Sequence, residues 1–123
     1  MPNIETDESH DLIASDKVEG TSVYDRNGTK LGSVATLMMD KRSGHVSYAV
    51  LSFGGFLGMG TSYHPLPWDQ LTYDSRQGGY VVDLTREQLE GAPVYSEPHE
   101  ARWDDPAYGR QIDAYYQSVE GRR

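Results

Sequence analysis

Short turns containing glycine interrupt this chain repeatedly between residues 20 and 83, and their spacing constrains the fold more than any other feature. Asn27-Gly28 suits the positive φ angles of a hairpin turn, and the run Lys41–Gly44 also ends in a glycine. Short segments rich in β-branched, aromatic and aliphatic side chains lie between the turns. The predicted strands are residues 21–24, 30–40, 45–53, 61–67, 71–74 and 80–83. Short strands joined in this way favour a mainly β fold, a small antiparallel barrel or sandwich.

Three of the predicted strands carry further signals. Residues 45–53 are apolar on both faces, which is typical of a central strand. Pro65 and Pro67 lack N–H donors, so the segment 61–67 is expected at an edge of the sheet or at an exit from it. Gly32 lies inside the segment 30–40 and predicts a bulge or a sharp bend, which small barrels need.

A short helix is predicted near residues 85–90. Thr85 is the expected N-cap, and Gln88, three residues later, completes a capping box. Gly91 and Pro93 then end the helix.

A second, amphipathic helix is predicted over about residues 105–120, with Asp105 as its cap and Pro106 at its first position. One face carries an apolar, aromatic stripe at helical spacing. The stripe consists of Tyr108, Ile112, Tyr115, Tyr116 and Val119. Because so short a helix is unstable alone, it must dock either on its own barrel or on a second subunit or partner. Both alternatives are open from the sequence.

The charge divides the chain into three predicted regions. Residues 1–11 form an acidic arm that is expected to be mobile, residues 12–95 form the barrel domain, and residues 96–123 form an extension with the amphipathic helix. The first 19 residues hold six acidic residues and one basic residue, more than half of the formal net charge of −8. This surplus of carboxylates disfavours nucleic-acid binding through a broad basic face, although the barrel itself is nearly neutral.

Several classes of function are disfavoured by what the sequence lacks. It has no cysteine, which excludes disulfides, thiolate metal sites and thiol catalysis. Its four histidines are not in a metal-binding motif, and G-x-S-x-G is absent. We therefore expect no enzyme activity, no catalytic residues, no metal and no cofactor. No apolar run approaches the roughly 20 residues of a membrane helix, and no signal peptide is visible, so a cytoplasmic protein without a transmembrane anchor is expected.

Two sets of apolar and aromatic residues are candidates for an interaction surface. Phe56, Leu57 and Met59 stand in the glycine-rich loop 54–60, where they either plug the barrel or contact a partner, and plugging is the favoured interpretation. The many aromatic residues near the C-terminus are typical of an interface that is partly exposed to solvent. The candidate residues are Phe56, Leu57, Met59, Trp103, Tyr108, Ile112, Tyr115 and Tyr116.

The stretch from about Leu12 to Tyr95, two thirds of the chain, resembles the PRC-barrel family. The residues that carry the resemblance are Gly20–Asp25, Asn27-Gly28, Leu31-Gly32, Met38–Asp40, Val50–Gly60, Pro67-Trp68, Leu71, Tyr80–Asp83, Glu87–Leu89 and Ala92-Pro93. Their order and spacing together are specific, whereas no single piece is. This family includes the cytoplasmic barrel of the photosynthetic reaction-centre H subunit, a domain of a ribosome maturation factor, and many stand-alone bacterial proteins.

The resemblance implies a small β-barrel of PRC type that acts in protein interaction, without a common set of catalytic residues. We therefore expect a non-enzymatic assembly module that resembles the H-subunit barrel, self-associates as a dimer or higher homo-oligomer, and binds a protein partner that is unknown. One alternative is an adaptor associated with ribosomes or RNA processing, as the maturation factor is. Another is an accessory protein of photosynthetic electron transport.

Overall fold

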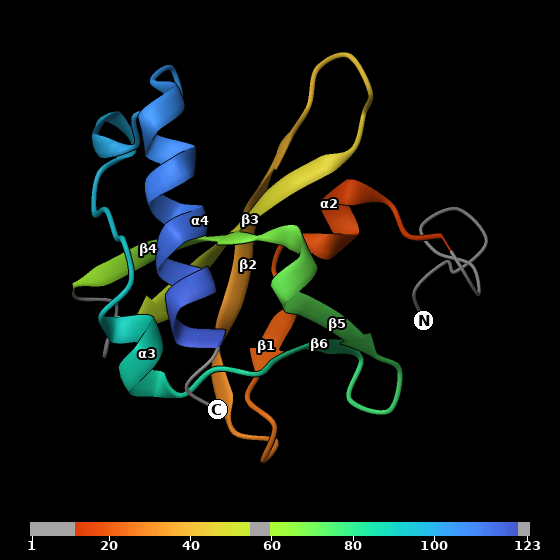
Figure 1. Ribbon diagram of the computed structural model, residues 1–123. Helices are drawn as coiled ribbons and strands as arrows, with labels where there is room; N and C mark the ends of the chain where they lie inside the picture. Colours follow the sequence, from red (N-terminus) through yellow and green to blue (C-terminus); the bar gives the residue numbers. More distant parts are fainter. Residues whose placement is uncertain (1–11, 55–59, 121–123) are drawn as a thin grey trace.

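A computed structural model of the chain describes residues 12–54 and 60–120 (Figure 1). Its strands are β1 (Ser22–Tyr24), β2 (Lys30–Met39), β3 (Val46–Gly54), β4 (Thr61–Pro67), β5 (Leu71–Asp74) and β6 (Gly79–Val82). Its helices are α2 (Ser15–Val18), α3 (Arg86–Glu90) and α4 (Pro106–Glu120), with the 3₁₀ turns η2 (Trp68–Gln70) and η3 (Pro98–Glu100). The mainly β fold with a C-terminal helix is confirmed, and the predicted strands agree with the observed ones to within one residue at each end.

The six strands form one sheet in the order β4-β3-β2-β1-β6-β5. Neighbouring strands are antiparallel except β1 and β6, which run parallel, with Val23 opposite Tyr80. The small barrel is therefore antiparallel as predicted, except at this one parallel pair. The physical reason is the order of the strands along the chain. Three strands, β2 to β4, come between β1 and the β5–β6 hairpin, and β6 of this hairpin then pairs with the free edge of β1. The direction of β6 is therefore not dictated by a turn shared with β1.

The sheet is strongly curled, because the turn η2 joins its two outermost strands directly. Neighbouring strands lie about 4.8 Å apart, so the edges of a flat six-stranded sheet would be about 24 Å apart. The three residues of η2 can span at most about 14 Å. The edges formed by β4 and β5 must therefore approach each other, as in a small barrel. Among the described residues these two strands do not pair, so the barrel is not closed by hydrogen bonds.

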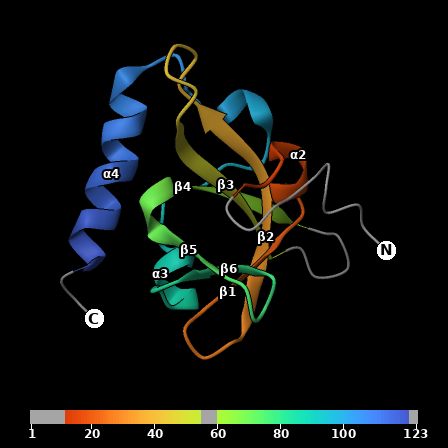
Figure 2. The same ribbon diagram turned by 90° about the vertical axis from the view of Figure 1, so that its right-hand side faces the viewer.

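Helices α3 and α4 complete the hydrophobic core of this open barrel. Leu89 of α3 and Ile112 and Val119 of α4 are buried in the same cluster as the inward residues of the strands. Helix α4 packs against β4, and Figures 1 and 2 show it running along one side of the sheet. The C-terminal helix and the barrel therefore share one core.

Gly32 allows two strands to approach closely. A Cβ atom at this position would lie 2.1 Å from the backbone oxygen of Ser52 on the neighbouring strand β3. The predicted irregularity occurs beside it: Val23 pairs with Gly32 but Tyr24 pairs with Lys30, which leaves Leu31 as the extra residue of a bulge.

The two short helices, α2 and α3, differ in whether the sequence predicts them. The capping box of α3 is present: the Thr85 hydroxyl accepts from the Gln88 N–H at 3.1 Å, and the Gln88 side chain accepts from the Thr85 N–H at 2.9 Å. Helix α2 was not predicted. It is a single turn in which only Val18 is buried, so it leaves no periodic signal in the sequence.

Candidate interaction surface

The structure places the aromatic stripe of the C-terminal helix against the protein's own sheet. Ile112 and Tyr116 have exposed fractions of 0% and 1%, and Tyr108 and Tyr115 are partly buried against the same core. Of the two docking alternatives, the structure shows the first, in which the helix docks on its own barrel. The other candidate residues, Phe56, Leu57 and Met59, lie outside the described residues.

Trp103 is the centre of an aromatic cluster that fixes the start of α4 to the sheet. Its ring centroid lies 5.3 Å from that of Tyr48 on β3 and 5.0 Å from that of Tyr108 on α4. The Tyr48 hydroxyl donates to Oδ1 of Asp113 at 3.1 Å. Burial and the Asp113 carboxylate raise the pKa of Tyr48 to about 12. At the other end of the helix, the Tyr115 hydroxyl donates to the Gln88 carbonyl and so ties α4 to α3.

Three hollows on the surface lie next to one another, and together we call them the polar groove. The β5 hollow, of about 640 Å³, is lined by Arg26, Asp69, Gln70, Thr72, Tyr73, Asp74, Ser75, Arg76, Val81 and Asp83. The α3 hollow, of about 410 Å³, is lined by Asp25, Arg26, Asn27, Asp83, Leu84, Thr85, Arg86, Glu87 and Gln88. The α4 hollow, of about 310 Å³, is lined by Pro67, Asp69, Gln70, Asp113, Tyr116 and Gln117. The first two share Arg26 and Asp83, and the first and third share Asp69 and Gln70.

Carboxylates outnumber cations in the polar groove. The six acidic residues of its lining are Asp25, Asp69, Asp74, Asp83, Glu87 and Asp113, and the three basic ones are Arg26, Arg76 and Arg86. Two of the cations are engaged within the protein. Arg26 forms an ion pair with Asp83 at 3.4 Å, and Arg86 lies over the Phe53 ring at 5.1 Å from its centroid.

The carboxylates of the groove are not equivalent. Asp74 accepts hydrogen bonds from the Gln77 side chain and from the Arg76 backbone N–H, which hold its pKa below the usual value. This carboxylate therefore stabilises the turn after β5. Asp69 on η2 is exposed, and Asp113 on α4 is half-buried. These two face the α4 hollow, whose lining contains no lysine or arginine.

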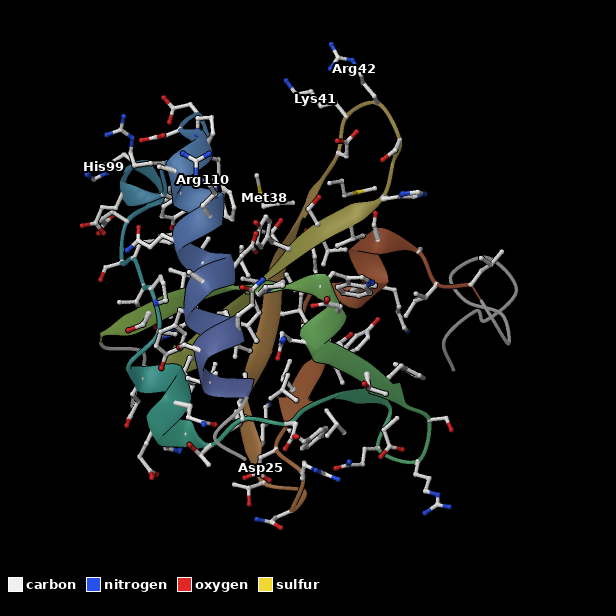
Figure 3. The ribbon with its side chains drawn as sticks, in the orientation of Figure 1. Asp25, Met38, Lys41, Arg42, His99 and Arg110 are labelled. Atoms are coloured by element: carbon white, nitrogen blue, oxygen red, sulfur yellow. The ribbon has the colours of Figure 1, made fainter. Side chains whose placement is uncertain are left out.

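The labelled cations in Figure 3 lie at the far end of the molecule from the α3 hollow. Lys41 and Arg42 stand at the tip of the β2–β3 hairpin, and Arg110 lies near the start of α4. Asp25, in the lining of the α3 hollow, lies at the opposite end. The chain therefore separates these exposed cations from that end of the polar groove.

Within residues 12–54 and 60–120, two buried polar side chains lack a hydrogen bond at one atom each. His64 has an exposed fraction of 2%; its ring donates to the Pro93 carbonyl, but Nδ1 has no partner among these residues. Burial lowers the pKa of His64, so the ring is neutral, and it packs edge-on against Phe53. The Tyr116 hydroxyl has no partner in the same part of the chain, and burial raises its pKa. Tyr116 belongs to the lining of the α4 hollow, whereas His64 lines none of the three hollows.

No pattern in the sequence indicates the polar groove. Asp69 lies in the short connection between the predicted strands 61–67 and 71–74, and Asp113 and Gln117 occupy the polar face of the predicted helix. Their i, i+4 spacing places those two side chains together on α4. No sequence signal indicates that this face of the helix lies opposite η2.

The described part of the chain lacks two other kinds of site. Within residues 12–54 and 60–120, no three histidine, aspartate or glutamate side chains are grouped so that they could hold a metal ion. Over the same residues, no helix combines the length and the apolarity that a membrane crossing requires.

Comparison with models of protein families gives a match that covers most of the chain. Residues 10–89 match the family model described as the PRC-barrel domain. This match includes all six strands and most of α3, and it ends before α4. A search of the curated proteins found no match.

Proposed function

The chain belongs to the PRC-barrel family, and we propose that it is a non-enzymatic module that binds another protein. The observation that carries this proposal is the polar groove, a set of three neighbouring polar hollows beside α3, β5 and α4. Neighbouring hollows of this kind offer an extended surface for contact. Catalysis would instead need reactive groups brought together at a shielded point. The groups with the strongest pKa shifts, Tyr48 and Tyr116, serve in the packing of α4.

The structure changes the basis of the predicted self-association. That prediction depended on the family resemblance and in part on the aromatic stripe of α4, and the stripe packs against the protein's own core. The proposal is therefore a partner of different sequence, bound in the polar groove. Light scattering on the purified chain measures self-association directly. If the chain forms a dimer that dissociates when the polar groove is blocked, the occupant of the groove is a second copy of this chain and not a different protein. The ribosome-associated and photosynthetic alternatives stay predictions.

Affinity capture from the native cell extract, with two matched tryptophan variants, tests the proposal. Thr72 is exposed on β5 and lines the middle of the groove, so Thr72→Trp should block it. Ser47 is an exposed small residue on β3 outside all three hollows, so Ser47→Trp is the control. We expect a protein that is captured by the natural chain and by Ser47→Trp but not by Thr72→Trp. Capture of the same proteins by both variants would overturn the proposal.

A further inference from the structure

We infer that Tyr63 and Tyr95 form a site of oxidative cross-linking, at which a one-electron oxidant joins the two rings by a carbon–carbon bond. The resulting dityrosine fastens the connection between α3 and α4, residues 91–105, to the edge strand β4. This inference is independent of the polar groove, because neither tyrosine lines any of the three hollows. It is carried by the backbone that pairs the two residues, by the geometry of their rings and by their partial exposure.

The backbone holds these two tyrosines directly opposite each other. Tyr95 forms an isolated antiparallel bridge with Tyr63, on the side of β4 that does not pair with β3. The Tyr63 N–H donates to the Tyr95 carbonyl at 2.8 Å, and the Tyr95 N–H donates to the Tyr63 carbonyl at 3.0 Å. Directly opposed residues have Cβ atoms about 5 Å apart on one face, so the two side chains leave the backbone side by side.

The stacking of the two rings sets this pair apart from other tyrosine pairs. The ring centroids lie 5.4 Å apart, and the angle between the ring planes is 24°. Two other pairs of tyrosine rings are in contact among the described residues, and they meet edge to face at 71° and 87°. These pairs are Tyr73–Tyr80 and Tyr115–Tyr116. A tyrosyl radical carries its spin on the oxygen and on the ring carbons beside it, and nearly parallel rings bring these carbons of both residues face to face.

Both phenols are open to an oxidant and have their hydroxyl ends together. Tyr63 and Tyr95 are each half-buried, so part of each side chain is in contact with solvent. Burial and the nearby Tyr63 hydroxyl raise the pKa of Tyr95, which agrees with two hydroxyls on the same side of the stack. The reactive carbons, which lie beside the hydroxyls, therefore lie at the same end of the two rings.

The coupling is a two-electron oxidation of the pair. Each phenol loses one electron to the oxidant and its hydroxyl proton to water, and the two radicals then combine at the ring carbons beside their oxygens. The hydrogen on each coupled carbon moves to the neighbouring oxygen, which restores both phenols. A haem peroxidase with hydrogen peroxide supplies the oxidant, because one peroxide takes up two electrons and two protons and becomes two waters.

The link would act as a covalent staple in a chain that cannot form a disulfide. The sequence has no cysteine. A bond between Tyr63 and Tyr95 closes a loop that contains β5, β6 and α3. Closing a loop of this length removes conformational freedom from the unfolded chain, so the linked protein is more stable than the unlinked one.

Treatment of the dilute, purified full chain with a haem peroxidase and hydrogen peroxide tests this inference. We expect a monomer that shows dityrosine fluorescence and whose mass has fallen by two hydrogen atoms. Trypsin should then release the peptide 43–76, which contains Tyr63, linked to the peptide 87–102, whose one tyrosine is Tyr95. The linked chain should unfold at a temperature about 10 °C above that of the untreated chain.

Two phenylalanine variants identify the tyrosine of the longer peptide. Tyr63→Phe keeps the ring but removes one phenol, so it should abolish the linked pair of peptides. Tyr73→Phe is the matched control, because Tyr73 lies in the same tryptic peptide and meets Tyr80 edge to face. It should leave the yield of the linked pair unchanged. Thermal unfolding of both variants before oxidation verifies that they are folded.

Three results would overturn the inference. The first is a link between peptides 43–76 and 87–102 that persists in Tyr63→Phe. The second is dityrosine that joins only separate chains or only other peptides. The third is a linked chain whose unfolding temperature equals that of the untreated chain, which would show that the bond does not fasten the connection.

Discussion

The hydroxyl of Tyr48 on β3 donates a hydrogen bond to the carboxylate of Asp113 on α4 at 3.1 Å. This contact joins residues 65 positions apart and lies beside the ring contact between Tyr48 and Trp103. It is one of the contacts that hold α4 on the sheet, and it also borders the α4 hollow, because Asp113 is part of that lining. The same pair makes the stability of the protein sensitive to alkaline pH.

Stability should fall as the pH rises above 10. Burial and Asp113 raise the pKa of Tyr48 from 10.0 to about 12, and burial also raises the pKa of Tyr116. An unfolded chain loses these protons at lower pH than the folded one, so unfolding releases protons above pH 10. The stabilisation is fully present below pH 10 and is lost as the pH passes through the folded-state values. Urea denaturation between pH 8 and pH 12 measures it, and Tyr48→Phe should show a weaker dependence.

Asp113→Asn should lower the pKa of Tyr48 from about 12 without bringing it to 10. The substitution removes the negative charge and weakens the hydrogen bond, whereas the burial of the ring, which is the larger cause, is unchanged. The difference between ultraviolet titrations recorded with and without Tyr48→Phe isolates this one tyrosine among nine. An unchanged Tyr48 pKa in Asp113→Asn would contradict the contact.

Stability should also fall as the pH drops below about 6.5, because of His64. Burial lowers the pKa of this histidine from its usual value of 6.5, so below that pH the unfolded chain binds a proton that the folded chain does not. The neutral ring contributes stability above pH 6.5, and this is lost as the pH falls through the folded-state value. His64→Leu should flatten the dependence of unfolding free energy between pH 6.5 and pH 5. The natural chain, measured in parallel, is the control, and an equal slope in His64→Leu would contradict the prediction.

Gly32→Ala should destabilise the fold by about 3 kcal/mol, because a new Cβ would overlap the Ser52 carbonyl at 2.1 Å and force β2 and β3 apart. Gly44→Ala provides the comparison. Gly44 lies in a turn at φ +80 with open space around it, so only backbone strain of about 1 kcal/mol is expected there. Chemical denaturation of both variants gives the two free energies. Equal losses of unfolding free energy in the two variants would show that Gly32 does not set the distance between β2 and β3.

Ile112→Ala should destabilise the whole protein by about 3 kcal/mol, because Ile112 is fully buried between α4 and the sheet. Its neighbour Gln111 is exposed, so Gln111→Ala should change the unfolding free energy by less than about 0.5 kcal/mol. Calorimetry gives the test. If α4 unfolded separately from the barrel, Ile112→Ala would produce two thermal transitions instead of one transition at lower temperature.

Much of the local structure could be predicted from the sequence. The Asn27-Gly28 turn, the capping box of Thr85 and Gln88, and the start of α4 after Asp105 all depend on residues within four positions of one another. The prolines of β4 also placed this strand at the sheet edge correctly, since a strand that lacks N–H donors fits poorly between two others. Resemblance to the PRC-barrel family supplied the overall fold.

The polar groove and its residues could not be predicted in this way. Asp69, Asp113 and Gln117 are ordinary polar residues in sequence, and they line one hollow only because α4 packs beside η2. The buried histidine was likewise indistinguishable from the exposed ones, because its burial depends on the strands and loops around β4. Contacts of this kind form only when segments that are far apart in the sequence pack together and bury their side chains.

The sequence by itself therefore determined which segments are strands and helices, where they turn, and that the C-terminal helix needs a surface on which to dock. Only the tertiary structure decided that this surface is the protein's own sheet, that β1 and β6 run parallel, and that three polar hollows lie next to one another. The physical reason is one of range. Turns and caps are fixed by hydrogen bonds between near neighbours, whereas Tyr48 recognises Asp113 only after the sheet has curled and the helix has buried Ile112 against it.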